Sequence, residues 1–257
     1  MKLGFIGTGV ITDAIVRGLL RAAHPASNIL VSRRNQDISA GLARLSPLVR
    51  ICDDNQTIVD EADIVFLAVR PQHAEQVLAP LVFGPDRQIV SLIATIPSDR
   101  IREWTHPKAR ICRAIPLPSV ENLSGVTAIF PAPPLVKALF ASLGEAVVAE
   151  TIEAFDAYAA TSALMGLYFG VSETAARWMQ AQGASHEDAR AYLAGVFQGL
   201  ADTATGSTNK SFEQLRLDHT TPGGLNAQMF QVFQDAQGVQ ALEAALDSVA
   251  DRIRKMH

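Results

Sequence analysis

The sequence predicts an α/β protein in which an N-terminal, Rossmann-type doubly wound sheet is followed by an all-helical dimerisation domain. Three observations support this prediction. Short β-rich runs alternate with helical patterns through the first half of the chain, a glycine-rich turn follows the first run, and strand signals stop after Glu150. Because 257 residues exceed the usual size of one domain, we expect two domains, at residues 1–150 and 151–257.

The strands of the first domain are predicted from short apolar runs that end in turn-forming residues. They are expected at Lys2–Ile6, Asn28–Ser32, Val49–Cys52, Asp63–Val69, Gln88–Leu92, Arg110–Ala114, Val126–Phe130 and around Val147. A helix from about Val10 to Ala23 separates the first two strands, and a short helix is expected at Leu135–Leu143. This alternation predicts right-handed parallel crossovers.

The second domain is predicted to be helical throughout. Helices are expected at Ile152–Gln182, His186–Thr205, from a cap at Thr220-Thr221-Pro222 to about Gln237, and at Val239–Lys255. Their long apolar faces have little sheet to cover. We therefore expect the C-terminal helices to pair with a second copy, giving a homodimer or a higher homo-oligomer.

Composition excludes several classes of protein. The formal net charge of −4 gives no electrostatic basis for binding nucleic acid or an anionic membrane surface. No apolar run approaches the roughly 20 residues that cross a bilayer, and Met1-Lys2 leads into a glycine-rich segment instead of a secretory signal, so we expect a cytoplasmic protein. Cys52 and Cys112 are too few for a disulfide framework or a zinc site, and no metal is predicted.

The turn after the first strand predicts a dinucleotide site. Its sequence is Gly7-Thr8-Gly9-Val10-Ile11, and Thr12 stands where the third glycine of the fingerprint would be. Gly7 allows the tight turn, and Gly9 allows the backbone to approach a pyrophosphate closely. The helix that begins near Val10 presents free N–H groups and its positive dipole end to the phosphates.

The end of the second strand indicates which dinucleotide binds. That strand ends in Ser32, Arg33 and Arg34, with no Asp or Glu at its tip to bind a ribose 2′-hydroxyl. Two guanidinium groups and a hydroxyl suit a 2′-phosphate, at roughly 1.5–3 kcal/mol for each charge-assisted hydrogen bond. Two such bonds predict a preference for NADP(H) over NAD(H) on the order of 100-fold.

Two further strands should end at the same edge of the sheet. Ala68, Val69, Arg70 and Pro71 follow a fully buried strand, where ligands of doubly wound sheets bind. Ala94 lies among small residues after the next strand, which would let a nicotinamide ring lie flat.

These residues resemble the pyrroline-5-carboxylate reductase family nearly from end to end. The segments that carry the resemblance are the glycine loop with Ala14, Asn55, Ala68-Val69-Arg70-Pro71-Gln72, Arg113-Ala114-Ile115-Pro116, Gly125-Val126-Thr127, Gly144, Asp156 and Thr221-Pro222-Gly223-Gly224. The resemblance implies an NADPH-binding domain, in which Asn55 contacts the cofactor, and an interleaved helical dimer. It also implies reduction of a cyclic imine carboxylate, pyrroline-5-carboxylate, to proline by hydride transfer to the C=N carbon.

Departures from the family pattern are concentrated on the substrate side. Leu117-Pro118-Ser119 replaces Asn-Thr-Pro, and only Ser162 survives of a serine-glycine stretch that here continues Ala163-Leu164-Met165. Thr221 with the Gly223 and Gly224 amides is the expected carboxylate cradle, since it lies at a helix N-terminus. Asn226 replaces a family hydroxyl and can still donate from its amide, so Thr221 and Asn226 are the residues expected to orient the imine.

Three alternatives are weighed. The altered pocket fits reduction of a different cyclic imine or imino acid, and a non-catalytic NADPH-binding regulatory protein would keep the cofactor site alone. A β-hydroxyacid dehydrogenase would carry a catalytic lysine in the helix after the first domain, but no lysine occurs between Lys137 and Lys210.

Overall fold

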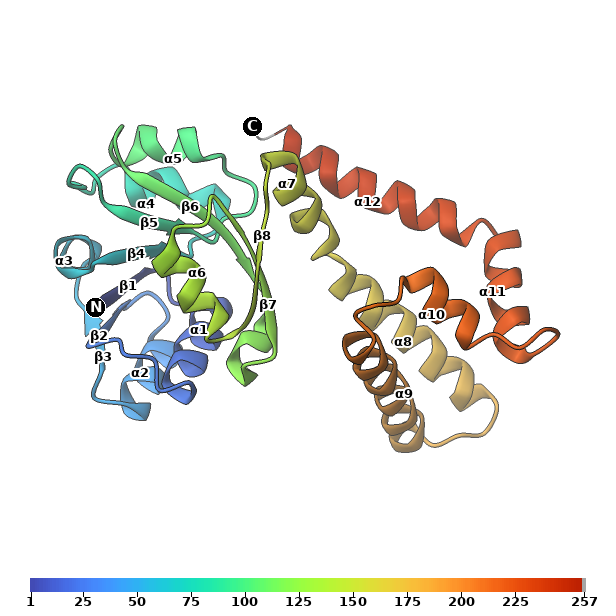
Figure 1. Cartoon of the computed structure of the whole chain (residues 1–257). Helices are drawn as coiled ribbons and strands as arrows, with labels where there is room; N and C mark the ends of the chain where they lie inside the picture. The colour runs from blue at the N-terminus through green and yellow to red at the C-terminus, as the bar shows by residue number, and fades with distance from the viewer. Residues whose placement is uncertain (256–257) are drawn as a thin grey trace. The chain divides into compact units, whose positions relative to one another are not determined.

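The computed structural model describes residues 1–255 and divides into two compact units (Figure 1). The first unit comprises Met1–Ser162 together with the described residues from Val249 onward, and the second comprises Ala163–Ser248. Only the C-terminal end of the last helix therefore belongs to the first unit.

The first unit contains an eight-stranded sheet, and every strand expected from the sequence is present. The strands are β1 (Lys2–Ile6), β2 (Asn28–Ser32), β3 (Val49–Cys52), β4 (Ile64–Leu67), β5 (Gln88–Ser91), β6 (Arg110–Pro116), β7 (Gly125–Phe130) and β8 (Gly144–Val148). Their order across the sheet is β3-β2-β1-β4-β5-β6-β7-β8. The chain reverses its direction of winding between β1 and β4, which is the switch point where doubly wound sheets bind ligands.

The parallel arrangement predicted throughout is wrong at one junction. β7 runs antiparallel to β6, whereas β1 to β6 are mutually parallel and β8 is parallel to β7. Only the short segment around the 3-10 helix η2 (Pro118–Asn122) joins β6 to β7. A parallel crossover needs a dozen or more residues, so this connection reverses the chain.

Helices cover both faces of the sheet, and each face has its own apolar core (Figure 1). On one face lie α1 (Val10–Arg21), α2 (Gln36–Leu45) and α6 (Pro134–Ala141), and on the other lie α3 (Asn55–Glu61), α4 (Ala74–Leu78) and α5 (Ser98–Trp104). Phe5 and Phe66 stack in the first core with ring centroids 4.5 Å apart. Burial on both faces explains why these strands are nearly continuous apolar runs.

A buried ion pair joins the sheet to the first helix after it, α7 (Ile152–Thr161). Arg113, on β6, is 1% exposed, and its guanidinium lies 3.4 Å from Asp156 and over the ring of Phe155. It also donates to the carbonyl of Ala94 at 2.6 Å. Burial lowers the pKa of Arg113, and the attraction of the Asp156 carboxylate partly offsets this. The pair therefore holds the segment after β5 against α7.

The second unit is helical, as predicted, but two boundaries differ and one helix was not expected. Its helices are α8 (Leu164–Ala181), α9 (His186–Gly206), α10 (Phe212–Asp218), α11 (Leu225–Asp235) and most of α12 (Gly238–Arg254). The long helix expected at Ile152–Gln182 breaks at Ser162, whose hydroxyl donates to the carbonyl of Ala159 at 2.7 Å. α10 was not predicted, and α11 begins at Leu225 instead of near Thr221.

Other sequence expectations concern thiols, metals and membranes. Both cysteines are free and buried, and burial raises the pKa of Cys112 to about 12, so this thiol is protonated at neutral pH. Within residues 1–255, no group of three or more His, Cys, Asp or Glu side chains could hold a metal ion. None of the helices in the same range is long and apolar enough to cross a membrane.

Replacing the buried carboxylate tests the Arg113–Asp156 pair. Asp156→Asn leaves a buried guanidinium without its counter-ion, so the free energy of unfolding should fall by about 3 kcal/mol. Urea denaturation followed by circular dichroism measures this change. Asp37→Asn, which removes an exposed carboxylate from α2, is the control. A loss no larger than that of the control would contradict the assigned role.

Candidate functional site

The turn between β1 and α1 has room for no side chain at its first position. Gly7 has a φ of +101°, a backbone conformation that side chains other than glycine rarely adopt. A Cβ atom there would overlap the carbonyl of Ala68, which follows β4. The carboxyl ends of β1 and β4 therefore approach each other closely at the switch point.

Three buried hydroxyl groups hold this turn. The hydroxyl of Ser32 accepts from the Gly7 amide at 3.0 Å, and the hydroxyl of Thr8 donates to the Ser32 carbonyl at 2.6 Å. Thr12 donates to the Gly7 carbonyl at 2.7 Å. From the sequence, the Ser32 hydroxyl was expected to contact a phosphate. In the structure Ser32 is only 5% exposed and its hydroxyl is bonded to the turn, so its role is to organise the loop.

The N-terminus of α1 is open to a ligand. Gly9 is the N-cap residue and supplies no side-chain cap, and the space beside its Cα is empty. The first-turn N–H groups of a helix have no partner within it, so those that follow Gly9 can bind an anion. Asp13 also lies in the first turn, but Arg17 holds both of its carboxylate oxygens at 2.9 Å and offsets its charge.

Two adjoining cavities lie at this edge of the sheet and share Gly7, Arg34 and Val69. Ten of the predicted cofactor residues line one or both: Gly7, Thr8, Gly9, Ser32, Arg33, Arg34, Asn55, Ala68, Val69 and Arg70. Val10, Ile11, Pro71 and Ala94 line neither. Val10 is 71% exposed on the open first turn of α1, and the Ala94 carbonyl is bonded to Arg113.

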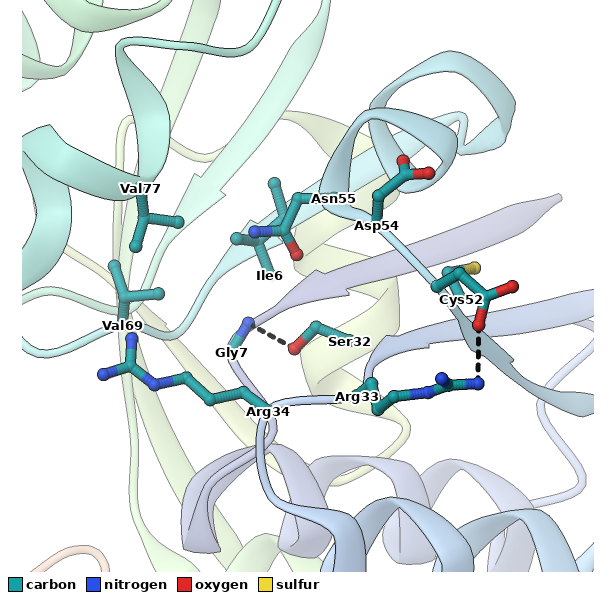
Figure 2. Close-up of a pocket in the computed structure, with 11 residues that line it drawn as sticks. Ile6, Gly7, Ser32, Arg33, Arg34, Cys52, Asp54, Asn55, Val69 and Val77 are labelled. Atoms are coloured by element: carbon teal, nitrogen blue, oxygen red, sulfur yellow. Dashed lines mark hydrogen bonds and ion pairs between the residues drawn. The ribbon is translucent and has the colours of Figure 1, made fainter.

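The two arginines after β2 point in opposite directions (Figure 2). Arg34 extends toward Val69 and forms no ion pair with any other residue of the described chain. Arg33 extends the other way and forms an ion pair with Asp53 at 2.5 Å. Asp53 was not among the residues expected at this site. Its position directly after β3 was the available signal, because the carboxyl ends of parallel strands meet at one edge.

Asn55 is the first residue of α3. Its carboxamide points toward Gly7 across the cavity that Arg33 and Arg34 also line (Figure 2). The neighbouring Asp54 caps the same helix by accepting from the Thr57 amide at 2.7 Å. That hydrogen bond holds the pKa of Asp54 below its usual range. The cap fixes the start of α3, and with it the place of Asn55. These groups together fit a dinucleotide that carries a 2′-phosphate.

In the helical unit, Thr221-Pro222-Gly223-Gly224 forms a tight turn and not the predicted helix cap. Gly223 has a φ of +73°, and the Gly224 amide donates to the Thr221 carbonyl at 2.9 Å, as in a type II turn. The Gly224 amide, predicted to bind a carboxylate, is therefore engaged. Gly224 is the N-cap of α11, and the Thr221 hydroxyl lies over it. The first-turn amides of α11 remain available to an anion.

Two other predicted substrate residues also have internal partners. The Asn226 side-chain amide donates to the His219 carbonyl at 2.7 Å, so it holds the loop that precedes α11. Its side-chain oxygen and the second N–H of its amide are left for a ligand. Ser162 ends α7 in the first unit, where its hydroxyl donates to the backbone.

Known proteins match the chain along nearly its whole length. A family model described as NADP oxidoreductase, coenzyme F420-dependent, matches residues 2–95, and one described as pyrroline-5-carboxylate reductase dimerisation matches residues 150–256. Pyrroline-5-carboxylate reductase of Vibrio alginolyticus is 28% identical over 271 residues, covering 99% of this chain and 97% of that protein.

Solved structures share the fold. A pyrroline-5-carboxylate reductase from Coxiella burnetii is 24% identical with a TM-score of 0.85, covering 99% of this chain and 97% of that one. The Plasmodium falciparum pyrroline carboxylate reductase, solved with NADP bound, is 17% identical with a TM-score of 0.83, covering 100% and 98%.

The fold and the residues at the sheet edge define an NADP-dependent oxidoreductase with a Rossmann-type domain and a helical dimerisation domain. Sequence and domain models then point the same way: residues 150–256 match the dimerisation domain of pyrroline-5-carboxylate reductases, and the chain is similar over nearly its whole length to proteins of that name.

The arginine pair generates a direct test. In Arg33→Ala/Arg34→Ala, affinity for NADPH should fall about 20-fold, because two charge-assisted hydrogen bonds to the 2′-phosphate are lost and one of them comes from a guanidinium that also pairs with Asp53, while affinity for NADH should change little. Fluorescence titration with each cofactor measures both values. Arg44→Ala, at an exposed arginine near the end of α2, should leave both unchanged. Equal losses for NADPH and NADH would show that these arginines do not bind the 2′-phosphate.

Proposed function

We propose that this protein reduces a cyclic imine carboxylate with NADPH, and that the substrate is pyrroline-5-carboxylate, which yields proline. The observation that carries the proposal is the similarity over 99% of the chain to a pyrroline-5-carboxylate reductase, together with an ordered NADP(H) site. We assign cofactor binding to residues 1–150, and substrate binding and dimer formation to residues 151–257.

The residues of the first unit hold the cofactor at three points. The open N-terminus of α1 behind Gly9 would hold the pyrophosphate, and Arg33 and Arg34 would hold the 2′-phosphate. Asn55 and the Ala68–Arg70 segment border the same edge. When bound, NADPH supplies the hydride that adds to the C=N carbon. The contribution of the protein is then positioning and electrostatics.

On the substrate side, Thr221 and α11 form the anion site. The Thr221 hydroxyl lies next to Gly224, the residue at which α11 begins, and the first-turn amides of that helix have no partner within it, so together they suit a carboxylate. The Asn226 side-chain oxygen can accept from the iminium N–H and so orient the ring, while its amide fixes the loop through His219. Thr221 and Asn226 are thus the proposed positioning groups for the imine.

A second candidate is a reductase of another cyclic imine. Leu164 and Met165 begin α8 and are 40% and 42% exposed, where the family pattern has small residues. Bulky apolar side chains at these positions favour a substrate of different shape. The chemistry at the cofactor is the same in both cases.

We infer that the protein is a homodimer formed through the helical unit. Large apolar side chains on α8, α9 and α11 are exposed, among them Phe169, Trp178, Tyr192, Leu225 and Met229 at 66–83%. An apolar surface of this kind is characteristic of an interface. Light scattering should give twice the mass of one chain. Two free, buried thiols suit a reducing compartment, and we place the protein in the cytoplasm.

Turnover of three imines tests the substrate. Purified protein should oxidise NADPH with pyrroline-5-carboxylate at least tenfold faster than with pyrroline-2-carboxylate or piperideine-2-carboxylate, a difference of about 1.4 kcal/mol in the barrier. NADPH absorbance follows the reaction, and the identity of the product is checked as proline. Faster turnover of another imine would transfer the assignment to the second candidate. Tight NADPH binding without turnover of any of the three would indicate a regulatory protein and contradict the proposal.

A further inference from the structure

The register of the sheet brings an acidic side chain to the 2′-phosphate site. Ser32 and Cys52 are direct partners in the β2–β3 ladder, and each is the last residue of its strand. The next residues, Arg33 and Asp53, therefore leave the sheet side by side, and their side chains meet at 2.5 Å. Both line the same cavity as Arg34 and Asn55.

Asp53 changes the charge of the site. Two arginines alone would present two positive charges to a ligand, but one carboxylate reduces the net charge of Arg33, Arg34 and Asp53 to one. The other nearby carboxylate, Asp54, is engaged as the cap of α3 and points away from Gly7 (Figure 2). Asp53 is thus the acidic group that faces an incoming 2′-phosphate at Arg33.

We propose that Asp53 is a specificity-determining residue that weakens the preference of this protein for NADPH over NADH. Its carboxylate holds Arg33 in the free protein, so a 2′-phosphate must displace it before it can bind that guanidinium. For NADH, the same carboxylate can accept a hydrogen bond from the ribose 2′-hydroxyl. The proposal rests on the assignment of Arg33 to the 2′-phosphate and is independent of which imine is reduced.

The size of the effect follows from the exposure of the pair. The side chains of Arg33 and Asp53 are 60% and 81% exposed, and ion pairs in such positions are weak. Removing the competitor should therefore improve binding of a 2′-phosphate by about fivefold, and not by orders of magnitude. With Asp53 in place, we expect a preference for NADPH of about 20-fold, below the 100-fold expected for two free arginines.

The test compares two probes that differ only by the 2′-phosphate, 2′,5′-ADP and 5′-ADP. Calorimetric titration of the full-length protein should show that Asp53→Asn binds 2′,5′-ADP about fivefold more tightly and binds 5′-ADP no more tightly than before. NADPH and NADH should follow the same pattern. Asp37→Asn, which removes a different exposed carboxylate, should change either affinity less than twofold.

A second background shows whether Asp53 acts through Arg33. In Arg33→Ala, 2′,5′-ADP should bind more weakly, and adding Asp53→Asn should improve it less than twofold, since no guanidinium remains to be released. An unchanged ratio of the two affinities in Asp53→Asn would overturn the proposal. An equal gain in 2′,5′-ADP affinity when Asp53→Asn is added to Arg33→Ala would also overturn it. The same holds if Arg33→Ala binds 2′,5′-ADP as tightly as the natural protein does. Because no imine is present, these outcomes are separate from failure of the proposed activity.

Discussion

The approach of Gly7 to the carbonyl of Ala68 brings the carboxyl ends of β1 and β4 together, and the cofactor site is built around that contact. No other residue fits at Gly7, because both its φ and the space beside it exclude a side chain. The hydroxyls of Thr8, Thr12 and Ser32 then bond the turn from within. The helix that follows is left with an uncapped N-terminus facing the switch point, which is the feature that an anionic cofactor requires.

The rest of the first unit supports this edge from behind. β5 ends beside β4, and the segment after it is held through the Ala94 carbonyl by Arg113. Arg113 is in turn paired with Asp156 on α7, so the sheet edge and the helix after it share one buried polar contact. Such pairs contribute little net stability when intact but are costly to break. Their value here lies in fixing the relative positions of the two segments.

The sequence predicts much of this arrangement because the strands are buried on both faces and the Gly7 turn has a specific composition. The sequence is less informative where one residue pattern is compatible with several local backbone structures. Pro222 suits the first turn of a helix and also the second position of a type II turn, and the backbone of Gly223 decides between them. Similarly, Ser32 could have bound a phosphate, and only the folded turn shows its hydroxyl engaged. The Arg33–Asp53 pair depends on how β2 and β3 are aligned, and the sequence of either strand alone does not determine that alignment.

Hydride transfer from the cofactor bound at this edge to the carbon of a cyclic imine carboxylate can be followed with an isotope. The most direct test supplies NADPH that carries deuterium at both C4 positions of the nicotinamide, together with pyrroline-5-carboxylate, and analyses the product by mass spectrometry and NMR. We expect proline with one deuterium, located at C5. Proline without deuterium, or oxidation of NADPH with no proline formed, would contradict it.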